Sequence, residues 1–193
     1  MKFAATVAAV VVLAGCSSNE ITEHPSNPEI QREITQIVEN VKNEQGTALY
    51  SDLRRLVAYD VFAVEQVAPL ATDPNARLRS NAMWVLAQIR DSERPDIGTQ
   101  IDAILRKGTK DDDATVKFEA AAGLAQRGSW DVLPILIDGL ENDDSTVRYR
   151  CHEQLVSTTS KSFGYNVDAP ETDRQAAAER WRRWYAGWAR SHG

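Results

Sequence analysis

The chain has 193 residues, of which 42% are hydrophobic and 26% are charged, and its formal net charge at pH 7 is −6. This length suits one domain or one continuous stack of repeats. The excess of acidic residues argues against general nucleic-acid binding, which requires a basic surface.

A short apolar run near the N-terminus has the features of an export signal. Lys2 supplies a positive charge, and residues 3–12 are apolar. Such a run of about ten residues matches a signal-peptide core and is too short to span a bilayer as a helix. The run leads into Leu-Ala-Gly-Cys, whose last residue is Cys16. This motif resembles the lipobox of bacterial lipoproteins, and an ordinary secretory signal with an incidental cysteine is the alternative.

The lipobox resemblance implies how the protein is held. Residues 1–15 form the signal peptide that is removed, and Cys16 becomes the lipid attachment site, with acyl chains such as palmitate on its sulfur and amine. Two or more chains anchor a protein stably without a transmembrane helix. Ser17 stands where an inner-membrane retention signal places Asp, so the resemblance implies the outer membrane of the cell envelope, on its periplasmic face. With Cys16 modified, Cys151 is the only free thiol, which excludes a disulfide framework.

Residues 16–28 are polar, contain two prolines and show no periodicity, which is typical of a flexible tether. From Glu29 onward helical spacing dominates, and Gly46 is expected to end the first helix. The apolar residues of that first helix are Ile30, Ile34, Ile37, Val38 and Val41.

Three stretches of the chain share one pattern and align without gaps: residues 73–87, 111–125 and 142–156. Each has an acidic or amide turn, then Val or Leu followed by Arg or Lys, then a small residue, then Leu. The Asp or Asn of the turn can cap the helix that follows it, and the apolar positions at i, i+4 and i+8 form one buried stripe. The stripe residues are Leu78, Ala82 and Leu86 in the first stretch, Val116, Ala120 and Leu124 in the second, and Val147, Cys151 and Leu155 in the third.

An amphipathic segment precedes each of these predicted helices, at residues 61–71, 97–107 and 130–141. Paired helices that recur at this interval are typical of an α-solenoid. The pattern Asp-x4-Val-Arg-x2-Ala-x3-Leu resembles the HEAT repeat over residues 60–156, and residues 48–58 resemble the second helix of a degenerate first repeat. We therefore expect an all-α, HEAT-like solenoid of about three to four helix pairs over residues 29–156.

The HEAT resemblance also implies a polar ladder between neighbouring repeats, built from the Asp of each turn and the basic residue that follows Val. These contacts are expected to be structural. Lys117 lacks the bidentate geometry of Arg, which weakens that rung. By position the ladder residues are Asp73, Asp111 and Asp143 (or Asn142), with Arg79, Lys117 and Arg148.

The last part of the chain, residues 157–193, is a polar loop followed by a Trp- and Arg-rich helix from about residue 171 to 190. Together the Phe-Gly-Tyr loop and this helix resemble C-terminal segments of HEAT-repeat proteins of Planctomycetes-type bacteria. We expect the helix to cap the solenoid. Its aromatic stripe is also a candidate interaction surface for protein or for a membrane interface. The stripe consists of Trp181, Trp184, Tyr185 and Trp188.

Few residues point to catalysis or metal binding. Cys151, His152 and Glu153 cluster, but neighbours on a helix point about 100° apart, and the cysteine takes the small-residue position of the repeat. The histidines lack a second ligand at helical spacing. The acidic turns at residues 111–113 and 141–144 lack the spacing of an EF-hand. We therefore predict no catalytic residue, metal ion or cofactor.

The sequence thus predicts a non-enzymatic protein-interaction or scaffold module, held at the cell envelope through lipid at Cys16. If the second helices line the binding surface, its positions include Ser80, Asn81, Glu119, Arg150 and Glu153. One alternative is a lyase-like role on a bound cofactor or protein, because short HEAT repeats resemble those of bilin-attachment enzymes. Another is a structural protein whose Trp/Arg helix lies on the membrane.

Overall fold

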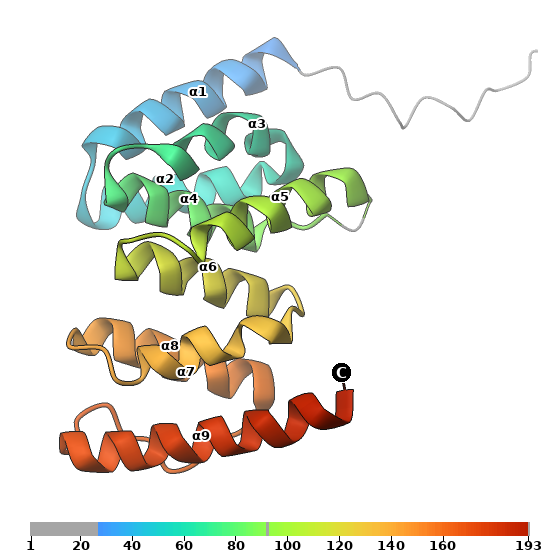
Figure 1. Ribbon diagram of the computed structural model, residues 1–193. Coiled ribbons are helices and arrows are strands. Elements are labelled where there is room, and N and C mark those ends of the chain that lie inside the picture. Colours follow the sequence, from blue (N-terminus) through green and yellow to red (C-terminus); the bar gives the residue numbers. More distant parts are fainter. Residues whose placement is uncertain (1–26, 92, 193) are drawn as a thin grey trace, which may run out of the picture.

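The computed structural model describes residues 27–91 and 93–192. The signal segment, the lipid site Cys16 and all of the tether except residues 27 and 28 lie outside the described residues. Within them the chain is all-α: helices stack in layers, from α1 at one end to α9 at the other (Figure 1). Four pairs precede a final long helix in this part of the chain, as the repeat pattern predicts. Among the described helices, none has the length and apolar character needed to cross a membrane.

The first pair consists of α1 (Pro28–Asn43) and α2 (Gly46–Ala58). The prediction that Gly46 ends the first helix is wrong in detail: α1 ends earlier, and Gly46, at φ +63°, begins α2. A guanidinium from the next pair helps to satisfy the end of α1, since Arg77 Nη2 donates to the carbonyl oxygen of Lys42 at 2.8 Å. The buried face of α1 consists of Ile34, Ile37, Val38 and Val41.

The segment expected as one amphipathic helix over residues 61–71 is instead broken into three short pieces. It forms the 3-10 helices η1 (Asp60–Ala63) and η2 (Ala68–Thr72), with the single α-turn α3 (Val64–Val67) between them. Pro69 supplies no backbone N–H, which interrupts a continuous α-helix at this point. The apolar residues still face the core, since Ala63, Val64, Val67 and Leu70 are buried.

The second helix of each later pair begins at its acidic or amide turn, as predicted. The turn has two tiers. Its first residue accepts the N–H of the residue two positions on, as Asp111 Oδ1 does from Asp113 at 2.9 Å. That later residue then caps the helix, as Asp113 does by accepting from Thr115 N–H at 2.9 Å. The bounds are α4 Ala76–Gln88, α5 Pro95–Gly108, α6 Ala114–Gln126, η3 Trp130–Val132, α7 Leu133–Gly139 and α8 Ser145–Thr159.

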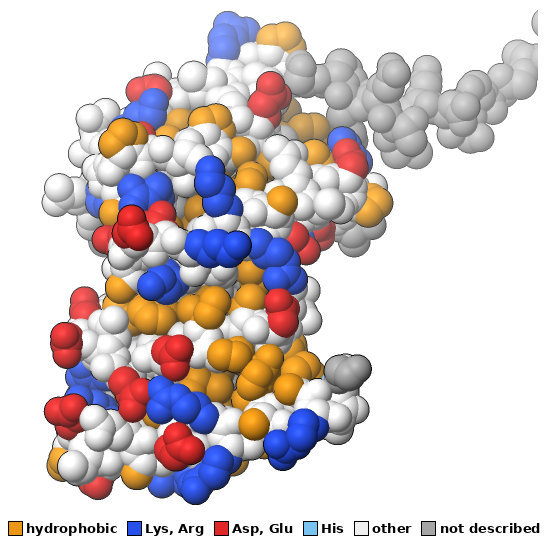
Figure 2. Space-filling model, viewed as in Figure 1, with side chains coloured by type: hydrophobic (Ala, Val, Ile, Leu, Met, Phe, Trp, Pro, Cys, Tyr) orange, Lys and Arg blue, Asp and Glu red, His pale blue; other side chains and the backbone are white. Residues whose placement is uncertain are grey.

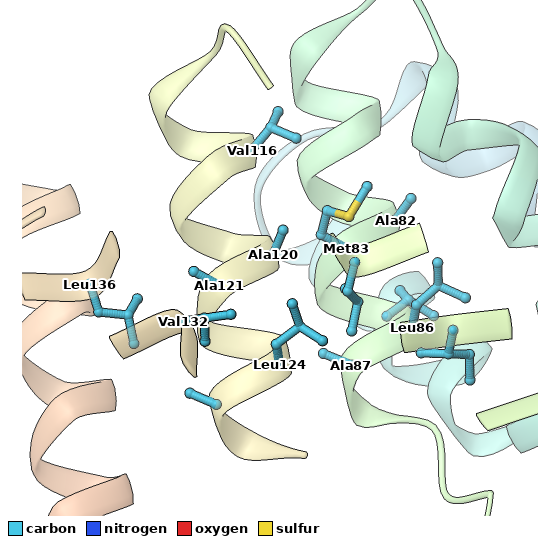
Figure 3. Packing of buried hydrophobic residues seen from close by; sticks show 14 of the residues in the cluster. Ala82, Met83, Leu86, Ala87, Val116, Ala120, Ala121, Leu124, Val132 and Leu136 are labelled. Carbon is cyan, nitrogen blue, oxygen red and sulfur yellow. The ribbon is translucent and has the colours of Figure 1, made fainter. Parts of the chain in front are cut away.

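Small residues bring neighbouring layers close together. In Figure 3, Ala120 and Leu124 of α6 point toward α4, while Ala121 points toward the next pair. All three are fully buried. Contact is so tight at Gly123 that an added Cβ would lie 2.7 Å from the Cβ of Ala87. Gly123 and Ala87 therefore permit the close stacking of α4 and α6.

The last helix, α9 (Glu171–His192), caps the stack by packing on α7 (Figure 1). Trp181 is fully buried and meets the ring of Phe163 edge-on at 4.8 Å. Arg182 reaches back to the last repeat, where its Nη2 donates to Asp138 Oδ1 at 3.2 Å and also to Glu141. An aromatic anchor and an ion pair thus close the end of the solenoid.

Candidate functional site: the second-helix groove

A hollow runs over the second helices α4, α6 and α8 and is here called the second-helix groove. Its volume is about 350 Å³, and it mixes aromatic, charged and small side chains. The groove is lined by Trp84 of α4, by Thr115, Phe118, Glu119 and Ala122 of α6, by Leu136 of α7, and by Val147, Tyr149, Arg150, Cys151, Glu153, Gln154 and Ser157 of α8.

One repeat position supplies a polar row across three helices. Asn81, Glu119 and Arg150 occupy equivalent places in the aligned stretches, so α4, α6 and α8 present them side by side. Arg150 Nη1 donates to Glu119 Oε2 at 2.5 Å. The two partners differ in exposure: the Arg150 side chain is 56% exposed, whereas that of Glu119 is only 13% exposed.

The carboxylate of Glu119 is held at an electrostatic cost. Burial raises the pKa of this carboxyl above its usual value, and the charge and hydrogen bond of Arg150 oppose that shift without cancelling it. Arg150 bonds to one carboxylate oxygen, Oε2, and in the described structure Oε1 accepts no hydrogen bond. Asn81, in the row's first position, has a buried Nδ2 without a hydrogen-bond partner. The polar row is therefore incompletely paired.

Aromatic rings surround this row. Tyr149 of α8 is 53% exposed, an unusual exposure for a large hydrophobic residue of this fold. Trp84 and Phe118 contribute partly buried rings to the lining. Tyr50 of α2 is equally exposed and lies 6.0 Å from Trp84, so the aromatic surface continues toward the first pair. Exposed aromatic rings around a few polar groups are typical of protein-binding surfaces.

The expected ladder has one full carboxylate rung. Arg79 reaches into the next repeat and binds Asp111 with two hydrogen bonds, Nε to Oδ2 and Nη2 to Oδ1, each 2.8 Å long. Its Nη1 also donates to the carbonyl oxygen of Asp73 in its own turn, at 2.9 Å. This guanidinium therefore connects two repeats and closes its own turn.

The two later positions of the ladder differ from this rung. Arg148 donates to two carbonyl oxygens of its own turn, those of Asn142 at 2.8 Å and Asp143 at 2.7 Å. The Lys117 side chain makes no hydrogen bond or ion pair among the described residues, and its backbone N–H donates to the carbonyl oxygen of Asp113. The sequence left Asp143 or Asn142 as the ladder residue of the third turn. Asn142 takes the position that Asp111 holds in the second turn, because its Oδ1 accepts the N–H of Asp144 at 2.9 Å.

Residues 64–156 match a protein family described as HEAT repeats. These residues form a HEAT-like α-solenoid. No curated protein matches the chain. The matched region starts with α3 and runs into α8, so it includes the elements that form the second-helix groove.

Sequence reasoning missed one largely buried polar contact within the HEAT-like repeats, that of Arg127. Arg127 follows α6, and its side chain is only 11% exposed. Its Nη2 donates to Asp91 and its Nε to Asp102, each at 2.6 Å. The same guanidinium also contacts the carbonyl oxygens of Ile89 and Gly98. Arg127 lies outside the repeated pattern and its partners are remote in sequence, so the only local signal was a basic residue beside Gly128.

A second missed feature is a further turn of the same kind before α9. Asn166 Oδ1 accepts the N–H of Asp168 at 3.0 Å, and Arg174 Nη1 donates to the carbonyl oxygen of Ala169 at 2.7 Å. This repeats the geometry of Asn142 with Arg148. Because two extra residues separate the turn from its arginine, gap-free alignment could not reveal it.

The Cys151 and His152 side chains have environments that suit packing. Cys151 is 1% exposed beneath the groove, and burial raises the pKa of its thiol to about 12, so the thiol stays protonated at neutral pH. Burial lowers the pKa of His152, whose ring lies 5.0 Å from that of Tyr165. Among the described residues, no three His, Cys, Asp or Glu side chains gather as a metal site would require.

The proposed aromatic surface of the last helix needs one correction. Trp181 is fully buried and so cannot form part of an exposed surface. The remaining three rings are partly exposed: Trp184 lies against Phe163, Trp188 packs on Trp130, and Tyr185 packs on Trp188. Figure 2 shows hydrophobic side chains gathered between the start of α7 and the C-terminal end of α9.

Proposed function

We propose that this protein is a non-enzymatic interaction or scaffold module that is displayed at the cell envelope. The observation that carries the proposal is the second-helix groove, with an exposed ring, that of Tyr149, beside an incompletely paired polar row. HEAT repeats support this role because stacked helix pairs form an extended binding surface. In this proposal the groove receives a segment of a partner protein.

The proposal includes an anchor at Cys16, processed as in bacterial lipoproteins, on the periplasmic face of the outer membrane. Its support is the Leu-Ala-Gly-Cys motif after a short apolar run. The test is metabolic labelling with a palmitate analogue, followed by membrane fractionation. Labelled protein in the outer-membrane fraction supports the anchor, and loss of both label and membrane association in Cys16→Ser is expected. Equal membrane association of the two proteins contradicts it.

The binding role is tested with two matched substitutions. Ala122→Arg places a long cationic side chain in the groove, whereas Ala103→Arg places the same side chain on the exposed surface of α5. Affinity capture from envelope fractions is expected to recover a specific partner with the wild-type chain and with Ala103→Arg, but not with Ala122→Arg. Recovery of no specific partner, or the same recovery with both variants, contradicts the proposed role.

A second candidate function is direct contact of α9 with lipid. Its Arg180, Arg183 and Arg190 side chains are exposed, and the partly exposed rings of Trp184 and Trp188 lie on the same helix. Aromatic and cationic side chains together suit a membrane interface. Anionic vesicles are expected to bind the Cys16→Ser chain if this contact exists, and the absence of binding eliminates it.

A further inference from the structure

The charged residues of the second-helix groove do not balance. The lining contains two carboxylates, Glu119 and Glu153, and one guanidinium, Arg150. The Glu153 side chain is 57% exposed, and its nearest cationic candidate is the His152 ring at 3.9 Å. Burial lowers the pKa of His152, so that ring is neutral at pH 7 and the groove keeps one uncompensated negative charge.

Arg150 shows what kind of group this groove accepts. Its guanidinium reaches across from α8 to a carboxylate of α6 at 2.5 Å. The Arg150 side chain is more than half exposed, so water can replace the carboxylate as its partner, whereas the Glu119 side chain is only 13% exposed. A guanidinium supplied by the protein itself therefore already occupies part of the site. The second oxygen of Glu119 remains available to another cation.

The rings around Glu119 suit the same occupant. Trp84, Phe118 and Tyr149 line the groove beside it. Aromatic faces attract Lys and Arg cations within about 6 Å of the ring centre. The long alkyl part of such a side chain also packs well on apolar lining such as Ala122 and Val147. Charge and shape thus favour one class of ligand side chain.

We propose that the second-helix groove binds a partner protein segment that presents a Lys or Arg side chain to Glu119, beside the rings of Phe118 and Tyr149. This inference rests on the proposed binding function and specifies its partner. The bound cation occupies the free side of the Glu119 carboxylate, and Arg150 either shares that carboxylate or swings outward. Apolar residues next to the cation in the partner segment contact the aromatic rings.

The test is a selection of displayed random peptides on the full-length chain in detergent, followed by fluorescence anisotropy with the selected peptides. We expect a basic residue next to an apolar one at a fixed position of these peptides. Glu119→Gln, which keeps the shape but removes the charge, is expected to weaken binding by about tenfold or more. Arg150→Ala removes the internal cation that competes for Glu119 and is expected to raise the affinity. Thermal unfolding checks that each variant is folded, and Ala103→Arg is the surface control.

The outcomes separate this inference from the proposed function. Two results would overturn the basic-ligand inference but still support a protein-binding groove. One is the selection of acidic peptides whose binding depends on Arg150. The other is the selection of apolar peptides whose binding is unaffected by Glu119→Gln. Peptides whose binding survives Ala122→Arg, or a selection that yields no enriched peptide, overturn both. Replacing the basic residue of a selected peptide by Gln gives an independent check, with a loss of about tenfold expected.

Discussion

Arg127→Ala is expected to be among the most damaging substitutions of a polar residue in this solenoid. One guanidinium joins the end of α6 to the connection between α4 and α5 through Asp91, and to α5 itself through Asp102. Truncation removes both charge-assisted bonds, at 2.6 Å each, and leaves two carboxylates without their cation. The loss thus affects the connection between two consecutive HEAT repeats.

The magnitude follows from the exposure of the three partners. Breaking a buried ion pair costs about 3–5 kcal/mol. Here the arginine is 11% exposed, but Asp91 and Asp102 are 27% and 41% exposed, so water replaces part of the lost interaction. We expect a decrease of about 3 kcal/mol in the free energy of unfolding. For a chain of this size that corresponds to a decrease of roughly 6–12 °C in Tm.

Urea denaturation monitored by circular dichroism measures this loss, and Arg106→Ala is the matched control. Arg106 also pairs with an aspartate 25 positions away, Asp131, at 2.8 Å, but the two side chains are 50% and 62% exposed. An exposed pair of this kind contributes about 0.5 kcal/mol. Equal losses for Arg127→Ala and Arg106→Ala would show that burial of the Arg127 guanidinium does not govern its contribution.

Three further predictions concern the C-terminal half. Trp181→Ala removes a fully buried ring and should lower the free energy of unfolding by about 3–5 kcal/mol. Trp188→Ala removes a partly exposed ring and should cost clearly less. Equal losses in urea denaturation would contradict the role of Trp181 as the anchor that holds α9 on the last repeat. Gly139→Ala should lower the free energy of unfolding by about 1–3 kcal/mol, because its new Cβ would overlap Cys151 Sγ. Cys151→Ala should therefore cost less stability in the Gly139→Ala background than in the wild-type chain. Additive losses in a double-mutant cycle would contradict this contact. Because the pKa of His152 is lowered in the folded state, the unfolded state binds more protons, and the free energy of unfolding should fall as the pH drops through about 6.5. His152→Phe should reduce this fall between about pH 7.5 and pH 5.5. An unchanged dependence of stability on pH would show that His152 does not cause it.

Elements with local signals could be predicted from the sequence. The start of α6 after Asp113 combines a capping side chain with an apolar stripe, and both signals lie within a few residues. The segment at residues 61–71 has the same apolar spacing, but Pro69 and the positive φ of Asp60, +56°, override it. Periodicity therefore identified which residues face the core there, but not the helix type.

Contacts between repeats were harder to predict. The Arg79–Asp111 rung could be placed because both residues belong to the repeated pattern. The contacts of Arg127 with Asp91 and Asp102 depend on a position that does not repeat. For the candidate site, the alignment placed Glu119 and Arg150 on one face, but only the stacking of α6 on α8 revealed that the carboxylate is buried and the arginine is not. Unequal burial arises from tertiary packing, which a local pattern does not encode.

The central claim is that the second-helix face is where this protein meets its partner. Site-specific photo-crosslinking in intact cells tests it most directly, with a photoreactive phenylalanine analogue in place of Tyr149 on α8 or of Ala103 on α5, both exposed. We predict a discrete crosslinked product from position 149 and none from position 103. No product at position 149, or the same product from both positions, would contradict the claim.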